Sequence, residues 1–190
     1  MIDLFQSIND FQGRLLREGI PSIIIGGVAV AVWGEPRVTR DIDLKVLIGR
    51  GEADRLLNVL KPDYTPMVPN PVELLKRQAI LFIRDTHGTR LDLLLAETPY
   101  DVKAIQRGRE VEIQPDIFIR VCSPEDLVIY KLISTRARDH EDAISVVRRQ
   151  GSELNEEYIV EWLRQFETAL DDSTLISEFH GLISKSNGGF

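Results

Sequence analysis

The chain has 190 residues, 43% hydrophobic and 28% charged, which is the composition of an ordinary globular protein with room for one good core. The formal net charge of −7 argues against non-specific nucleic-acid binding as the main activity. A single cysteine, Cys122, excludes an internal disulfide framework, and neither a secretory signal nor a membrane-spanning apolar stretch is visible, so we expect a cytoplasmic protein with no membrane partner.

The first part of the chain predicts a helix, a strand and a second helix. Apolar residues recur on one stripe over 3–18, which indicates an amphipathic helix. The apolar run 22–25 predicts a buried strand, and Gly26 and Gly27 lead from it into a helix over 28–33. Glycines at this place let a backbone approach a phosphate at a helix N-terminus, although a tight turn alone would also account for them.

Two carboxylates open the next predicted strand, over 42–48. Asp41 and Asp43 stand at i and i+2, so their side chains point to the same face. Aligned like charges repel unless a cation lies between them, and hard oxygen ligands suit Mg²⁺. Solvated acids in a turn or edge strand are the alternative. Arg37 and Arg40 flank the acids, either as surface charges that neutralise them or as cations that meet triphosphate oxygens.

A third acid lies in the middle of the chain. The elements predicted there are a helix at about 52–60, a loop over 61–71, and a hairpin of strands over 79–84 and 90–95. Asp92 is the single acid inside the second strand of this hairpin. Because a lone acid in a buried strand is costly unless paired or bound to metal, Asp92 is either a metal ligand or the ion-pair partner of Arg90 or Arg84.

The rest of the chain predicts the end of a sheet and then only helices. The elements that complete the sheet region are a helix near 100–107 and strands over 109–113 and 117–121. Ser123, Pro124 and Asp126 form a strong helix start, with a Ser cap, Pro at the first helical position and an acid three residues on. We predict an α/β (α+β) fold, with a mixed sheet flanked by helices over 1–122 and a helical C-terminal region over 123–190.

Three separated stretches form a recognisable set. The first is a hydrophobic residue followed by Gly-Gly, and the other two place acids next to hydrophobic residues. They are Ile25-Gly26-Gly27, Asp41-Ile42-Asp43-Leu44 and Leu91-Asp92-Leu93. As a set they resemble the polymerase-beta-type nucleotidyltransferase superfamily. The local sequence around the first two stretches is most similar to that of the toxin-type nucleotidyltransferases of bacterial abortive-infection (type IV) systems and their stand-alone relatives. The stretch from Ser123, Ser-Pro-x-Asp-Leu followed by Lys131-Leu132 and by Arg-x-x-Asp, resembles a helical motif of the same family.

The resemblance implies a Mg²⁺-dependent transfer of a nucleoside monophosphate from an NTP to an acceptor hydroxyl. Asp41, Asp43 and Asp92 would hold two Mg²⁺ ions, with Asp92 also placed to take the acceptor's proton, and Gly26 and Gly27 would seat the β- and γ-phosphates.

The resemblance also suggests a catalytic role for Lys131, which would reach the nucleotide phosphates. Because Lys131 interrupts an apolar helix face, it must snorkel or meet an anion. The alternative is an ion network satisfied within the helical region, where Asp139 and Asp142 share a helix face with Arg138 close by.

The expected acceptor is an RNA 3′ end, with tRNA first, because a basic segment accompanies the helical region. Its members are Lys131, Arg136, Arg138, Arg148 and Arg149. A protein or small-molecule hydroxyl is the runner-up acceptor. The competing class of function is a non-catalytic nucleotide-binding module or an antitoxin-like regulatory partner.

Overall fold

The computed structural model describes residues 4–39, 41–134 and 136–187, and the chain divides into two compact units. The first unit consists of residues 1–28 and 38–122, and the second of residues 29–37 and 123–190. Residues 29–37 thus pack with the second unit, although the boundary predicted at residue 122 places them with the first.

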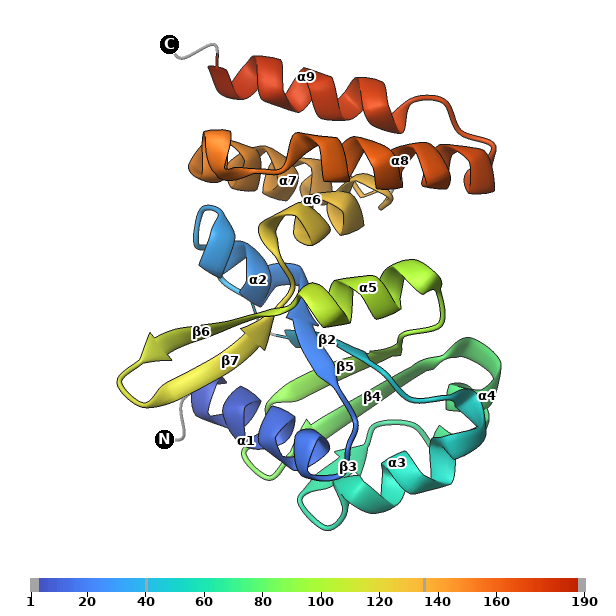
Figure 1. Ribbon diagram of the computed structural model, residues 1–190. Helices are drawn as coiled ribbons and strands as arrows, with labels where there is room; N and C mark the ends of the chain where they lie inside the picture. The colour runs from blue at the N-terminus through green and yellow to red at the C-terminus, as the bar shows by residue number, and fades with distance from the viewer. Residues whose placement is uncertain (1–3, 40, 135, 188–190) are drawn as a thin grey trace. The chain divides into compact units, whose positions relative to one another are not determined.

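A seven-stranded mixed sheet forms the centre of the first unit (Figure 1). Its strands are β1 (Ser22–Ile25), β2 (Asp41–Val46), β3 (Tyr64–Pro66), β4 (Ile80–Asp85), β5 (Arg90–Leu95), β6 (Arg109–Gln114) and β7 (Ile117–Val121). They lie in the order β3-β4-β5-β2-β1-β7-β6, and the pairs β2–β5 and β1–β7 are parallel. The predicted mixed sheet is therefore confirmed.

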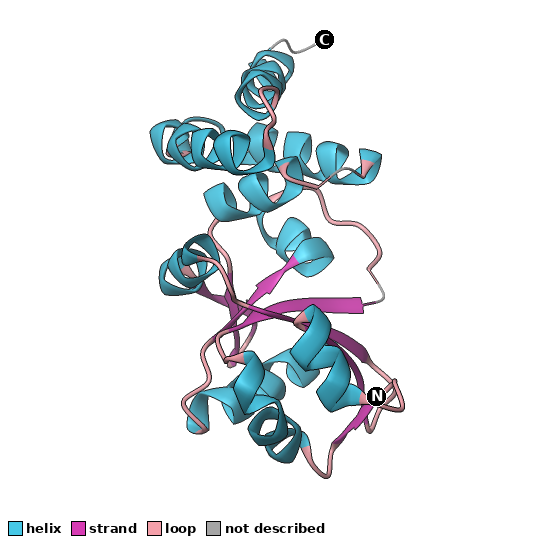
Figure 2. Cartoon of the chain, turned by 90° about the vertical axis from the view of Figure 1, so that its right-hand side faces the viewer, coloured by secondary structure: helices cyan, strands magenta, loops and turns pink. Residues whose placement is uncertain are grey.

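Helices cover both faces of this sheet. They are α1 (Leu4–Arg17), α3 (Ala53–Leu60) after a short 3-10 turn at Arg50–Glu52, α4 (Pro71–Gln78) and α5 (Pro99–Arg107). Helices α1, α3 and α4 lie on one face and α5 lies on the other (Figures 1 and 2).

Strand β2 shows how the two faces of the sheet differ. Ile42, Leu44 and Val46 are fully buried, whereas the alternate residues are partly exposed. On the α5 face, Lys45 forms an ion pair of 2.8 Å with Asp101, which also belongs to the capping box that begins α5. Since side chains alternate along a strand, Asp41 and Asp43 lie on the same face as Lys45.

The second unit is helical. Its elements are the end of α2 (Gly26–Trp33), then α6 (Pro124–Leu132), α7 (Ala137–Gln150), a 3-10 turn at Gly151–Glu153, α8 (Glu156–Leu170) and α9 (Leu175–Asn187). Helix α6 packs against α7 and α8, and α9 packs against the same two helices. The Ser123 hydroxyl accepts a 3.1 Å hydrogen bond from the Asp126 backbone N–H, so the predicted helix start is confirmed. Within the described ranges, no helix has the length and apolar character needed to cross a membrane.

Two elements lie where the sequence pattern predicted none. The prediction of a loop over 61–71 is wrong at β3, an edge strand that pairs only with β4. Pro66 is compatible with this strand because an edge strand needs hydrogen bonds on one side only. Pro71 occupies the first turn of α4, where its missing N–H has no intrahelical partner to lose.

Candidate active site

The three predicted metal ligands lie on two neighbouring strands of the first unit. In the parallel pairing of β2 with β5, Asp43 lies opposite Asp92, and Asp41 lies opposite Arg90. The Asp92 side chain is 13% exposed and the Asp41 side chain 45% exposed. The site therefore has a deep end at Asp92 and an open end at Asp41. We call Asp41, Asp43 and Asp92 the acid cluster.

Gly26 places the start of α2 beside the acid cluster. Its φ of +63° belongs to the left-handed region, and this conformation turns the chain sharply from β1 into α2. A Cβ atom at this position would lie 2.8 Å from Cγ of Asp43, so glycine is also required for space. Gly27 is buried in the first turn of α2. The backbone N–H groups of a first helical turn lack intrahelical partners, which makes them available to an anion.

The guanidinium of Arg90 lies against the acid cluster and contacts two of its carboxylates. Its Nε and Nη2 donate to the two carboxylate oxygens of Asp92 at 2.7 and 2.9 Å, and Nε lies 3.9 Å from Asp41. The guanidinium carbon stands 5.1 Å from the centroid of the Phe82 ring. The hydrogen bond with Asp92, together with the charges of Asp92, Asp41 and Asp43, raises the pKa of Arg90.

The ion pair of Asp92 with Arg90 is the alternative to metal ligation that the sequence left open. The signal for it was already present, because Arg90 stands two positions before Asp92 and so shares its face of the strand. Phe82, opposite Asp92 on β4, had no comparable signal in the sequence.

The donor chemistry of the acid cluster suits a hard divalent cation, since all three side chains offer carboxylate oxygens. In the part of the chain that the structure describes, no three His, Cys, Asp or Glu side chains stand close enough together to hold a metal ion. In this arrangement Arg90 engages both oxygens of Asp92.

Arg37 and Lys131 take part in an ion network inside the second unit. Arg37 donates from Nε and Nη2 to the two oxygens of Asp142, both at 2.8 Å. The Lys131 ammonium donates to Asp142 at 2.8 Å and to Asp139. The Ser134 hydroxyl donates to the other oxygen of Asp139 at 2.5 Å. With Lys131 only 7% and Asp142 only 4% exposed, this network is buried.

The two cations of the network stabilise the ionised form of its two acids. Burial by itself would raise the pKa of Asp142, but hydrogen bonds from Arg37 and Lys131 outweigh it and hold the pKa below its usual value. At Asp139 burial is likewise outweighed by hydrogen bonds from Lys131 and Ser134, so its pKa is also lowered. The nucleotide-binding role of Arg37 and the catalytic role of Lys131 stay predictions, and Arg40 lies outside the described residues.

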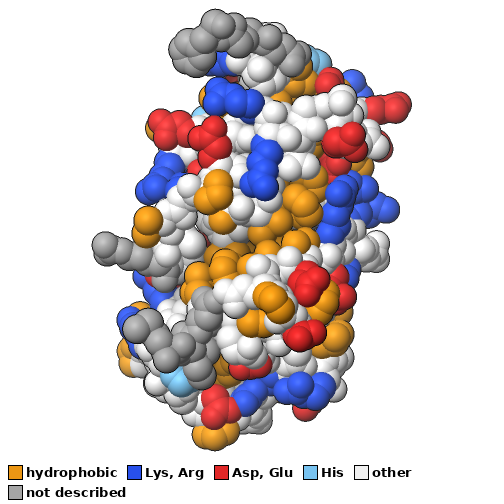
Figure 3. Space-filling model, turned by 90° about the vertical axis from the view of Figure 1, so that its left-hand side faces the viewer, with side chains coloured by type: hydrophobic (Ala, Val, Ile, Leu, Met, Phe, Trp, Pro, Cys, Tyr) orange, Lys and Arg blue, Asp and Glu red, His pale blue; other side chains and the backbone are white. Residues whose placement is uncertain are grey.

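The predicted basic segment is largely engaged within the second unit. Besides the buried Lys131, Arg149 donates to the Gly34 carbonyl at 2.6 Å and Arg148 lies 3.5 Å from Glu35. On the face drawn in Figure 3, basic side chains are scattered among acidic and neutral ones. Four arginines of the segment are exposed, and Arg136 and Arg138 are the two whose side chains do not take part in these contacts, so they are candidates for contact with a phosphate backbone.

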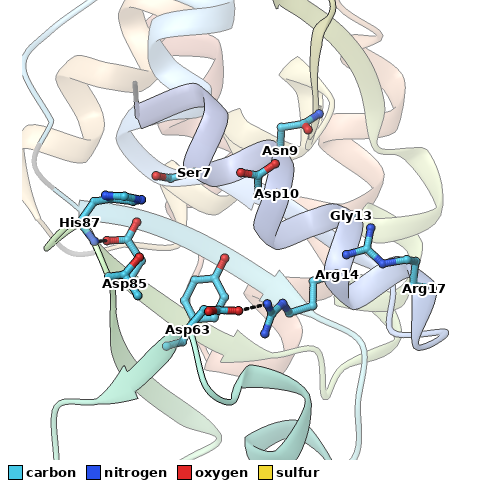
Figure 4. A pocket seen from close by; sticks show the side chains of 11 residues that line it. Ser7, Asn9, Asp10, Gly13, Arg14, Arg17, Asp63, Asp85 and His87 are labelled. Atoms are coloured by element: carbon cyan, nitrogen blue, oxygen red, sulfur yellow. Dashed lines mark hydrogen bonds and ion pairs between the residues drawn. The ribbon is translucent and has the colours of Figure 1, made fainter. Parts of the chain in front are cut away.

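A hollow of about 380 Å³ lies between α1, β3 and the turn that joins β4 to β5 (Figure 4). It contains none of the predicted site residues. Arg14 points to Asp63 and also donates to backbone carbonyls at the end of α3, and Asp85 accepts from the backbone N–H groups of its own turn. These polar groups therefore serve the fold.

Family membership follows from the match of residues 1–150 to the family model described as "Nucleotidyltransferase of unknown function (DUF6036)". The chain belongs to this nucleotidyltransferase family. No curated protein shows a significant sequence match to it.

Solved structures of nucleotidyltransferases share the fold of this family member. One is the antibiotic-resistance factor ANT(2'')-Ia, with a TM-score of 0.56 and 17% identity over 88% of this chain and 94% of that one. The same factor in complex with adenylyl-2''-tobramycin has a TM-score of 0.55 and 16% identity, over 85% and 98% of the two chains. An antigenic nucleotidyltransferase-like protein from Paracoccidioides brasiliensis has a TM-score of 0.51 and 17% identity, over 92% of each chain. The predicted superfamily and fold are confirmed.

Proposed function

We propose that this nucleotidyltransferase transfers a nucleoside monophosphate from an NTP to an acceptor hydroxyl, with Mg²⁺ held by Asp41, Asp43 and Asp92. The observation that supports it is the register of β2 and β5, which aligns the three carboxylates on one face, with the start of α2 beside Asp43. Carboxylates together with substrate phosphates are the usual ligands of Mg²⁺ in proteins.

Each element of the site has a distinct task in this reaction. The acceptor oxygen forms a bond to the α-phosphorus while the bond from that phosphorus to the bridging oxygen of the β-phosphate breaks, and pyrophosphate leaves. Two bound Mg²⁺ ions would neutralise the triphosphate and lower the pKa of the acceptor hydroxyl. Gly26 and Gly27 bind the β- and γ-phosphates through the backbone at the start of α2. Asp92, at the deep end of the acid cluster, takes the proton of the acceptor.

The test is neutralisation of one acid at a time. Asp43→Asn and Asp41→Asn are expected to lower transfer by about 10³-fold or more while the circular dichroism spectrum stays unchanged, because each removes an anionic ligand and keeps the side-chain shape. Asp54→Asn is the matched control, since Asp54 is an exposed acid of α3 outside the cluster. Full activity of the Asp41→Asn/Asp43→Asn double variant would refute the mechanism.

The pairing of Asp92 with Arg90 supports a second candidate, a nucleotide sensor that binds a triphosphate without transferring it. Thermal stabilisation by each NTP with Mg²⁺ and product formation should be measured on the same sample. Stabilisation without product identifies the sensor, whereas both together identify the transferase.

Two kinds of acceptor hydroxyl are to be tested. An RNA 3′ end stays the first acceptor to test. Lys131, Arg148 and Arg149 have partners within the second unit, so the exposed Arg136 and Arg138 are the first basic residues to test. The complex of ANT(2'')-Ia with adenylyl-2''-tobramycin makes a small-molecule hydroxyl the second acceptor to test. Labelled NTPs with Mg²⁺ and either total tRNA or an aminoglycoside panel separate the two, because label appears in one fraction or the other.

A further inference from the structure

The acid cluster carries one feature that a metal site alone does not require. Arg90 binds Asp92 with two parallel hydrogen bonds, which occupy both oxygens that would face a metal ion. A guanidinium bound in this way competes with a metal ion for the Asp92 carboxylate, because two cations held at the same carboxylate repel each other. An ion that binds through Asp92 therefore weakens or replaces the contact with the guanidinium.

Charge explains why the cluster holds an internal cation. Asp43 and Asp92 lie directly opposite each other on adjacent strands, and Asp41 is two residues from Asp43 on the same face. Like charges at such positions destabilise a sheet. Lys45 on β2 is paired with Asp101, whereas Arg90 on β5 contacts both Asp92 and Asp41 and supplies positive charge to the cluster.

Arg90 is both held in place and able to leave. The Phe82 ring lies 5.1 Å from the guanidinium carbon, which supports the side chain over the cluster. A guanidinium cannot lose its charge by deprotonation in a protein, so it can vacate the site only by moving. Its side chain is 36% exposed, which provides a route to solvent without unfolding of the strand.

We propose that Arg90 is a resident cation that a divalent metal displaces, and that the released guanidinium then binds the triphosphate. The inference rests on the proposed function, since it assigns a control element to the same acid cluster. Metal and nucleotide then bind cooperatively: the metal frees Arg90, and the triphosphate supplies its next anionic partner. By linkage, the nucleotide raises metal affinity by the same factor as the metal raises nucleotide affinity.

The decisive experiment is titration of Mn²⁺ into the metal-free protein by calorimetry, without nucleotide. The Arg90→Gln variant is expected to bind Mn²⁺ about tenfold more tightly than the unaltered protein, because the competing bidentate pair is gone. The same variant should unfold at a lower temperature in the absence of metal, because Asp92 and Asp41 lose the positive charge of Arg90. Unchanged or weaker Mn²⁺ binding by Arg90→Gln would overturn the proposal.

The control variant is Arg84→Gln. Arg84 lies opposite Arg90 on β4 and donates to the Gly88 carbonyl in the hairpin turn, so its loss removes an equal charge nearby and leaves the Arg90–Asp92 pair in place. A tenfold gain in Arg84→Gln as well would show a general charge effect and overturn the role of Arg90.

A second titration, with α,β-methylene analogues of ATP, CTP, GTP and UTP present, tests the coupling. The unaltered protein should gain Mn²⁺ affinity from the analogue it accepts, and Arg90→Gln should lose most of this gain. Equal gains in the two proteins would overturn the coupling. If neither protein binds Mn²⁺ under any of these conditions, the proposed function fails, and this outcome differs from failure of the Arg90 proposal alone.

Discussion

At Gly26 the polypeptide satisfies two requirements that only glycine meets together. The backbone has a positive φ of 63°, and the carboxylate of Asp43 occupies the space into which a side chain would project. From the sequence, we interpreted this glycine as a residue that lets the backbone approach a phosphate. The structure adds that Asp43 itself approaches the backbone, so the geometry of the acid cluster depends on a hydrogen atom at this position.

Gly26→Ala is expected to lower the free energy of unfolding by about 1–3 kcal/mol, because the left-handed conformation is strained for alanine and Asp43 must move. It should also abolish most nucleotidyl transfer. Urea denaturation and a transfer assay measure the two effects. Gly51→Ala is the control, since no atom lies within 4 Å of its added Cβ and its φ is not positive. Equal stability and activity of the two variants would contradict the steric interpretation.

At the scale of elements, helices α6 and α7 are joined by buried ions. Lys131 of α6 bonds Asp139 and Asp142 of α7, and Arg37, just beyond α2, bonds Asp142 from the other side. The cations and acids balance, so the network is neutral while it is complete. Because breaking one partner leaves an uncompensated buried charge, the network responds strongly to a single substitution.

Lys131→Met is expected to lower the free energy of unfolding by about 3–5 kcal/mol, since two buried carboxylates lose their shared cation. Urea denaturation at neutral pH measures this loss. A catalytic Lys131 would in addition lower transfer in the fraction of protein that remains folded. Lys131→Arg should restore stability, and failure to do so would contradict a role that rests on charge.

The pH dependence of stability follows from the lowered pKa values of Asp139 and Asp142. The unfolded chain, whose aspartates titrate at about 3.9, binds protons first as the pH falls. The stabilisation is therefore complete above this value and is lost as the pH falls through the lower pKa values of the folded protein. Urea denaturation series from about pH 6 to about pH 3 should show a steeper acid loss for the unaltered protein than for Lys131→Met. Parallel profiles would contradict the assignment.

The helices and strands that the sequence predicted correctly are those with a clear period or start signal. The amphipathic stripe of α1, the alternation in β2 and the Ser-Pro start of α6 are local features, so they can be recognised without a partner. Strand β3 was missed because its three residues form a strand through their pairing with β4 and show no pattern of their own.

At the scale of the molecule, charge bears on the choice of acceptor. The net charge is −7, and Arg136 and Arg138 are exposed basic residues of the C-terminal basic segment that lie apart from the contacts of Arg148 with Glu35 and of Arg149 with Gly34. An RNA acceptor would depend on such a pair, because phosphate contacts supply most of the affinity for nucleic acids and weaken with salt.

Arg136→Glu/Arg138→Glu is expected to lower labelling of tRNA about tenfold at low salt and to leave transfer to a small molecule unchanged. Arg148→Glu/Arg149→Glu should act differently. Loss of the contacts with Glu35 and Gly34 should lower the midpoint of thermal unfolding first. Labelling of tRNA that ignores both salt and the Arg136→Glu/Arg138→Glu change would contradict recognition through this surface.

The sequence by itself pointed to the three acids of the cluster and determined that two of them, Asp41 and Asp43, share a face. Side chains alternate with a period of two along a strand, which places Asp41 and Asp43 on one face. A glycine pair after an apolar run indicates a sharp turn from a strand into a helix. These are short-range relations, and they hold whatever the strand pairs with.

Only the tertiary structure decided the partners of these groups. The order β5-β2-β1 brings Asp92 opposite Asp43, and Arg37 meets Asp142 across 105 positions of the chain. Local sequence patterns do not predict which strands pair or which buried acid forms an ion pair with a given arginine. Those choices follow from packing the sheet and the helices as a whole, because each buried charge must find a partner there.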